Sequence, residues 1–207
     1  MSKSNEIRVL FVRTGQTEWD MAGRIAGSVD VPLSRLGHEQ VGQAAAELGD
    51  TQLSTVYTGP DEASLATAHE IAKLTGAKVK VAPDLSEMNL GLWQGLLVTQ
   101  LQEKCPSCVR ALREDACSVQ APEGESLEEA SERLMGALAR TVGKARADSG
   151  AVGVVLRPIA SALVGCAIKG LPTRNLLSMM DSGLTMEWRT VQRSMIAPVR
   201  ERARAGT

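Results

Sequence analysis

Two arginines stand directly after hydrophobic segments, where side chains can gather into a site. Arg13 follows the segment 7–12, and Arg157 follows the segment 151–156. A guanidinium stays charged at neutral pH and offers five N–H donors in a planar fork, which suits the oxygens of a phosphate group. Residues of this type at these two places therefore indicate a site for an oxyanion.

Chemistry at phosphorus needs more than cations. It needs an activated nucleophile and an acid that protonates the leaving group. Thr14 follows Arg13, but a free hydroxyl is a poor nucleophile near neutral pH and the sequence shows no base beside it. Glu87 is a candidate acid. The two histidines of the chain, His38 and His69, lie within predicted helices, so we expect no histidine relay.

These residues must be positioned by strands and helices, which the sequence predicts in alternation. Short runs rich in β-branched and apolar residues predict strands at 7–12, 53–58, 79–82, 151–156 and, antiparallel at the edge of the sheet, 183–191. Apolar stripes predict helices over 34–48 and 61–74, and Ser126 with Glu129 forms a capping box that starts a third helix reaching towards Gly150. This order predicts an α/β fold, a three-layer α/β/α sandwich around a mostly parallel sheet.

Five motifs follow one another in a fixed order. They occupy residues 13–20 (with Gly23, Arg24 and Gly27 behind them), 30–34, 57–60, 87–95 and 122–126. In this order the motifs resemble those of the histidine phosphatase (phosphoglycerate mutase-like) superfamily, over most of the chain. The resemblance implies one domain over residues 1–199, with a small helical cap-like insertion at about 97–122, and a charged tail at 200–207.

The resemblance also identifies three departures from the family's catalytic pattern. Thr14 stands where the family has its nucleophilic histidine, Ala63 where it has a phosphate-binding arginine, and Arg157 where it has a second histidine. Glu87 matches the candidate proton donor of the family. We therefore expect a catalytically inactive pseudoenzyme, and a phosphomonoesterase that works by a non-histidine route is the alternative.

The retained residues predict a pocket for phosphate or a small phosphorylated ligand. The predicted ligand-binding residues are Arg13, Thr14, Gly15, Thr17, Arg24, Glu87 and Arg157. Other roles stay open, because Arg13 could pair with Glu87 or Asp20, and Glu87 could pair with Arg157 or anchor a loop. An open cleft with Arg13 beside Arg157 would indicate a ligand, whereas a closed salt bridge between Arg157 and Glu87 would indicate a scaffold for a protein partner or a homo-oligomer.

The cysteines do not predict a metal or redox site. Cys105 and Cys108 are close in sequence and Cys117 would be a third ligand, but no fourth ligand lies nearby. The helical surroundings differ from those of a thioredoxin-like pair. We therefore expect free thiols, and neither a metal nor a cofactor.

The composition excludes some classes of binding partner. The 23 basic and 24 acidic residues give a net charge of −1, which offers no electrostatic attraction to nucleic acid or to an anionic membrane. The apolar run near residue 7 is too short for a signal peptide or a membrane span. The sequence predicts a cytoplasmic protein.

Overall fold

One five-stranded sheet organises the part of the chain that the computed structural model describes, residues 6–145, 150–172, 175–180 and 185–196. The strands are β1 (Glu6–Arg13), β2 (Leu53–Thr58), β3 (Lys78–Val81), β4 (Ala151–Leu156) and β5 (Met186–Gln192), in the order β3-β2-β4-β1-β5. Neighbouring strands are parallel except β5, which pairs antiparallel with β1 at the edge. The carboxyl ends of β1, β2 and β4 therefore meet along one side of the sheet.

Helices connect and cover these strands. They are α1 (Glu18–Met21), α2 (Arg35–Glu47), α3 (Glu62–Thr75), α4 (Val98–Lys104), α5 (Pro106–Glu114), α6 (Leu127–Thr141), α7 (Pro158–Lys169) and α8 (Leu176–Met180). Short 3-10 turns lie at 83–85, 91–93, 116–118, 142–144 and 193–195.

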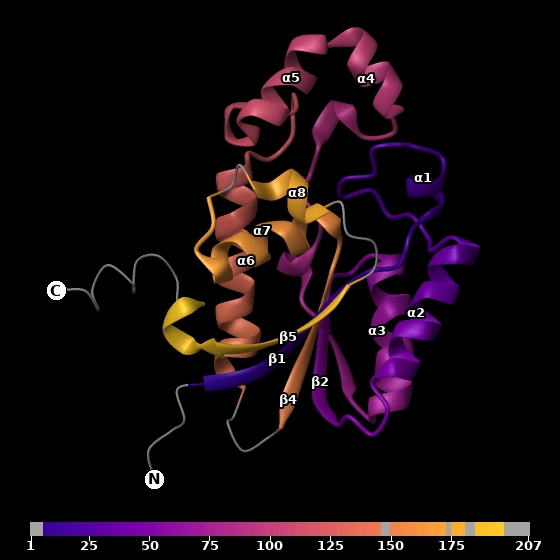
Figure 1. Cartoon of the computed structure of the whole chain (residues 1–207), viewed down its shortest axis with the longest axis vertical. Coiled ribbons are helices and arrows are strands. Elements are labelled where there is room, and N and C mark those ends of the chain that lie inside the picture. The colour runs from indigo at the N-terminus through magenta and orange to yellow at the C-terminus, as the bar shows by residue number, and fades with distance from the viewer. Residues whose placement is uncertain (1–5, 146–149, 173–174, 181–184, 197–207) are drawn as a thin grey trace, which may run out of the picture.

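Two apolar cores separate the layers. On one face of the sheet, residues of α2 and α3 such as Ala45 and Ile71 pack against Leu10 of β1. On the other face, residues of α6 and α7 such as Leu138 pack against Val9. Figure 1 shows the same arrangement, with α2 and α3 to one side of the sheet and α6 and α7 to the other. The predicted α/β sandwich with a mostly parallel sheet is confirmed.

Most element boundaries match the local sequence signals. The strands 53–58 and 151–156 occur as predicted, and the capping box of Ser126 and Glu129 opens α6. The third helix was predicted to run towards Gly150, but α6 ends at Thr141 and a 3-10 turn follows. The start of the predicted final strand, at Gly183, lies outside the described residues.

The segment 97–122, called the cap segment below, holds α4, α5 and the 3-10 turn at 116–118. It lies at the top of the molecule in Figure 1, beyond the upper ends of the parallel strands. Leu101 and Ala121 form a small core there with Trp93. That the cap segment is an insertion into one domain over 1–199 stays a prediction, and the predicted tail at 200–207 lies outside the described residues.

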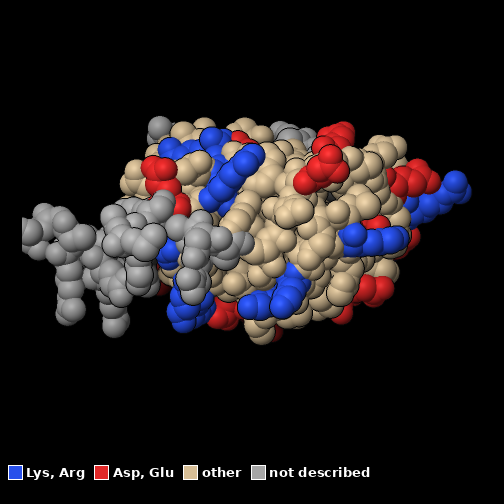
Figure 2. Space-filling model, turned by 90° about the horizontal axis from the view of Figure 1, so that it is seen from below, with Lys and Arg blue, Asp and Glu red and all other residues tan. Residues whose placement is uncertain are grey.

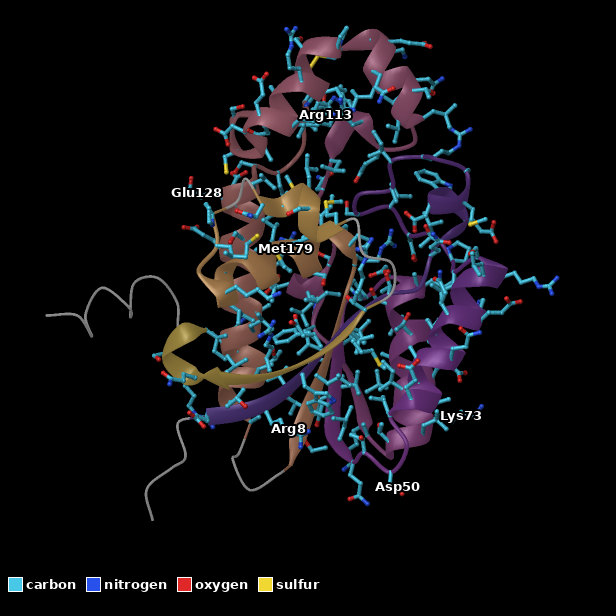
Figure 3. All side chains as sticks on the ribbon, viewed as in Figure 1. Arg8, Asp50, Lys73, Arg113, Glu128 and Met179 are labelled. Atoms are coloured by element: carbon cyan, nitrogen blue, oxygen red, sulfur yellow. A yellow bond between two sulfur atoms is a disulfide. The ribbon has the colours of Figure 1, made fainter. Side chains whose placement is uncertain are left out.

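The opposite end of the molecule carries charges of both signs. Figure 2 views the molecule from that end and shows acidic and basic side chains interspersed among the others. Asp50 and Lys73 lie near this end, whereas Arg113 lies in the cap segment (Figure 3). Among the described residues, no helix is long and apolar enough to cross a membrane.

Candidate ligand-binding site

Arg157 lies at the carboxyl end of β4, where it precedes α7. Its side chain is only 2% exposed, and it lines two cavities, one of about 340 Å³ and one of about 170 Å³. The guanidinium donates one hydrogen bond, from Nη1 to Oδ1 of Asp61, and at 3.4 Å this bond is longer than the usual 2.7–3.2 Å. Its Nε has no partner among the described residues. A buried cation with five donors therefore has donor capacity left for a ligand.

Arg133 on α6 provides a contrast, because all three of its side-chain nitrogens donate hydrogen bonds within the protein. Two of its nitrogens donate to the carboxylate of Glu125, at 2.7 and 2.8 Å. It also donates to the backbone carbonyls of Asp84 and Ser86, each at 3.0 Å, and to that of Glu87 at 3.4 Å. Arg133 thus fixes the loop that carries Glu87, which is a structural role.

Glu87 reaches across to the start of α7. One carboxylate oxygen accepts from the backbone N–H of Met88 at 2.7 Å and of Ala160 at 2.8 Å, and the other accepts from that of Ile159 at 2.7 Å. Burial raises the pKa of Glu87, although these three N–H donors and the charge of Arg157 oppose the rise. Glu87 is therefore a loop anchor at a helix N-terminus, and its oxygens are already occupied.

The salt bridge of Arg157 with Glu87, which would have indicated a closed scaffold, does not form. Arg157 bonds to Asp61 instead and influences Glu87 only through its charge. Asp61 also accepts from the backbone N–H of Ser64 at 3.0 Å, which caps the N-terminus of α3. Sequence reasoning missed Asp61 as a site residue. The signal that could have found it is an aspartate at the first position of the predicted helix 61–74, where such a residue caps a helix N-terminus.

Several buried polar atoms around Arg157 have no partner among the described residues. They come from the ends of neighbouring strands and from the start of α3: Thr14 Oγ1, Thr58 Oγ1, Asp61 Oδ2, Ser64 Oγ and Arg157 Nε. The backbone places Thr14 beside β4, because its N–H donates to the carbonyl of Leu156 at 3.0 Å. Unsatisfied buried polar atoms are rare in proteins. The three hydroxyls and Nε of Arg157 can donate to ligand oxygens, whereas Asp61 Oδ2 can only accept.

Thr14 is 3% exposed and its backbone lies beside the end of β4, but no base among the described residues is hydrogen-bonded to its hydroxyl. His38 and His69 are exposed on α2 and α3, so neither activates it. Ala63 is fully buried against Leu33 and Val41. The position that the family resemblance assigned to an arginine thus lies in a small apolar cluster.

The other predicted ligand residues lie further out or serve the backbone. Arg13 donates from Nη1 to the carbonyl of Met180 at 2.5 Å and lines neither cavity next to Arg157. Thr17 caps α1 through a reciprocal pair of bonds with Asp20, at 2.7–3.2 Å. Arg24 is exposed, lines the larger cavity and donates to the carbonyl of Gly95 at 2.7 Å.

Gly15 lies against the backbone of another segment of the protein, not against a cavity that could hold a ligand. A Cβ at this position would lie 2.5 Å from the carbonyl oxygen of Gly37. A Cβ at Gly37 would lie 2.0 Å from the carbonyl oxygen of Gln16. These two glycines are required because the turn after β1 packs against the first turn of α2.

The predicted free thiols are wrong at two positions. Cys105 and Cys108 form a disulfide where α4 ends and α5 begins, and only Cys117 and Cys166 are free among the described residues. The two cysteines are three positions apart in sequence, and their Cα atoms lie 5.3 Å apart, within the range that a disulfide spans. No group of three or more potential metal ligands occurs in the described part of the chain.

A comparison with known families identifies this architecture. Residues 9–185 match the histidine phosphatase superfamily, branch 1. The chain belongs to the histidine phosphatase superfamily. The match covers strands β2, β3 and β4, most of β1, the cap segment and Arg157, and it confirms the resemblance that the sequence motifs indicated.

Two curated bacterial relatives are named as phosphatases, and others are named as probable phosphoglycerate mutases. Phosphoserine phosphatase 1 of Hydrogenobacter thermophilus is 33% identical over 132 residues, which cover 64% of this chain and 63% of that protein. Glucosyl-3-phosphoglycerate phosphatase of Mycobacterium tuberculosis is 36% identical over 109 residues, which cover 53% and 49%. The chain therefore spans less than two thirds of the length of these relatives.

Solved structures of the superfamily share the whole fold. A mycobacterial glucosyl-3-phosphoglycerate phosphatase in complex with VO3 has a TM-score of 0.75 and 28% identity, covering 89% of this chain and 97% of that one. A phosphoglycerate mutase of Bacillus anthracis has a TM-score of 0.78 at 17% identity, covering 92% and 90%, which shows the fold alone.

Proposed function

We propose that this member of the superfamily binds a phosphorylated or similar anionic ligand at Arg157 and does not hydrolyse it. One observation carries the proposal: Arg157 is almost fully buried, yet it makes a single long hydrogen bond among the described residues. Burying a charge without full compensation is costly, so proteins retain such groups mainly where they have a use. The phosphatase relatives, one of them solved with the phosphate analogue VO3, favour a phosphate group as the ligand's head.

Loss of catalysis rests on the residues at the three degenerate positions. Thr14 has no base, Ala63 brings no guanidinium, and Arg157 cannot accept or release a proton at neutral pH. Burial raises the pKa of Glu87, but its two oxygens accept three backbone N–H groups at the start of α7 and at Met88, which supports an anchoring role for this carboxyl group. Among the described residues, no histidine near Arg157 is placed to form a covalent phosphoryl intermediate by the route that the family uses.

The alternative is a phosphomonoesterase that uses Thr14 or a water molecule as nucleophile. The named activities of the curated relatives favour it. The absence of any base hydrogen-bonded to Thr14 among the described residues weighs against it.

One experiment separates the two functions. Turnover of a broad panel of phosphomonoesters is measured with the wild type and with Thr14→Ala, together with a search for acid-labile, base-stable phosphohistidine. We expect background turnover, no phosphohistidine, and a saturable rise of the melting temperature with phosphate, because a ligand that binds only the native state stabilises it. Hydrolysis that survives purification and disappears in Thr14→Ala would establish the alternative.

A further inference from the structure

The larger cavity beside Arg157 is apolar over most of its wall. It measures about 340 Å³, which falls at the lower end of the range of roughly 300–1,000 Å³ for small-molecule sites. It lies between the start of α7 and the cap segment. Its aliphatic and aromatic lining includes Trp93, Leu101, Val109, Leu112, Leu127 and Leu177.

The wall of this cavity does not depend on the cavity being filled. Leu101 and Ala121 of the cap segment pack with Trp93 of the preceding segment, so the cap segment is held above the space by a core that is already formed. At the same time Val98 is 48% exposed and Leu177 is 36% exposed, although both line the cavity. A ligand with an apolar body would bury this surface and would be favoured for that reason.

Four charged residues line the same cavity, and the hydrogen bonds that they already make indicate the charge of the ligand. The two acidic residues already have donors: Asp20 accepts from Thr17, and both oxygens of Glu87 accept from backbone N–H groups. The two arginines retain donor capacity, since Nε of Arg157 has no partner among the described residues and Arg24 is exposed at the mouth. The groups left to bind a ligand are therefore donors and cations.

We propose that the ligand is an amphipathic anion, an aliphatic chain that ends in a phosphate or carboxylate group. The head group binds Arg157 and the chain lies under α4 and α5, against Leu101, Val109 and Leu112. This inference rests on the proposed function, because it places the ligand's head at the same arginine, and it adds the chemical class of the ligand's body.

The test is a series of monoalkyl phosphates of increasing length, from ethyl to octyl phosphate, titrated calorimetrically below the concentration at which they aggregate. Inorganic phosphate measures the head group alone. Each buried methylene strengthens binding by about threefold to fourfold, so octyl phosphate should bind on the order of a hundredfold more tightly than butyl phosphate. Octanoate, in a parallel titration, shows whether a carboxylate replaces the phosphate head.

Two matched variants test where the alkyl chain of the ligand lies. Leu112→Trp fills the cavity from α5 and should abolish the dependence on chain length. Leu36→Trp adds the same ring on the exposed face of α2, where the leucine is 43% exposed, and should leave the whole series unchanged.

The outcomes distinguish this inference from the proposed function. Affinity that is independent of chain length, with inorganic phosphate bound normally, overturns the apolar ligand and keeps the phosphate site. Failure of every compound, inorganic phosphate included, overturns both. A dependence on chain length that persists unchanged in Leu112→Trp places the chain elsewhere and also overturns the inference.

Discussion

The contrast between two arginines makes the proposed ligand site testable without knowing the ligand. Replacing Arg157 by methionine keeps the bulk of the side chain and removes the charge. If Arg157 were part of a structural ion pair, removing one partner of a buried pair would cost about 3–5 kcal/mol.

The structure predicts a much smaller loss. Arg157 contributes one bond, at 3.4 Å, and both acidic neighbours keep other donors when it is gone: Asp61 keeps the Ser64 N–H, and Glu87 keeps three backbone N–H groups. Removing a buried and poorly paired charge also relieves its desolvation. We therefore expect Arg157→Met to lower the free energy of unfolding by less than about 1.5 kcal/mol, which corresponds to less than about 6 °C in Tm for a chain of this size.

Arg133→Met is the matched control, because Arg133 makes the short bonds to Glu125 and the carbonyls of the Glu87 loop. Its loss should cost about 3 kcal/mol or more, from several hydrogen bonds at roughly 0.5–1.5 kcal/mol each, because the Glu125 carboxylate would keep only the backbone N–H of Asn89.

Phosphate binding should distinguish the two variants in the opposite way: the variant that loses little stability should lose the ligand. Phosphate at about one hundred times its Kd stabilises the native state by about 2.7 kcal/mol, and this shift should survive in Arg133→Met and disappear in Arg157→Met. Both quantities come from chemical denaturation and thermal melts with and without phosphate. A loss of 3–5 kcal/mol in Arg157→Met, with an unchanged phosphate shift, would refute the reasoning and make Arg157 a structural residue.

Three further predictions follow from neighbouring residues. Burial raises the pKa of Glu87 above its ordinary value of 4.5, so the folded state binds the carboxyl proton more tightly than the unfolded state does. The resulting stabilisation is complete below pH 4.5 and is lost as pH rises through the raised pKa. The free energy of unfolding of Glu87→Gln, measured against pH, should lack this decrease. Gly37→Ala should lower Tm by several degrees in a thermal melt, since its Cβ would lie 2.0 Å from a backbone oxygen, whereas Gly42→Ala, with nothing within 4 Å, should not. The triple variant Thr14→His, Ala63→Arg, Arg157→His should hydrolyse a chromogenic phosphomonoester faster than the product of the single effects allows, and a folded but inactive triple variant would show that the pocket has also changed shape.

The sequence predicted the parts of the fold that depend on local pattern. Strands β2 and β4 are continuous runs of apolar or β-branched residues, so their ends could be read directly. Helix α7 was not predicted, because Pro158–Lys169 is apolar on nearly every side and so carries no stripe. Proline at its first position was the one local sign of its start.

The site was predictable only where residues directly follow the ends of predicted central strands, because such ends lie at one edge of a parallel sheet. Thr14 and Arg157 were expected together because each follows a central strand. The pairing of Arg157 with Asp61 depends on how α3 docks beside β4, and the demand for glycine at Gly15 depends on a backbone contact with Gly37. Neither long-range contact leaves a periodic trace in the sequence.

The strand order has a consequence for how the chain reaches its native state during synthesis. β1 lies between β4 and β5, so Val9 pairs with Val152 and Arg189, which are made more than 140 residues later. At roughly 5–20 residues per second, the first strand waits about 7–28 s for its partners. During this interval Leu10 and Val12, both buried in the finished sheet, have no neighbouring strand to cover them. Folding of this sheet is therefore expected to be slow and largely post-translational, and the nascent amino-terminal strand is the segment that a chaperone would need to protect.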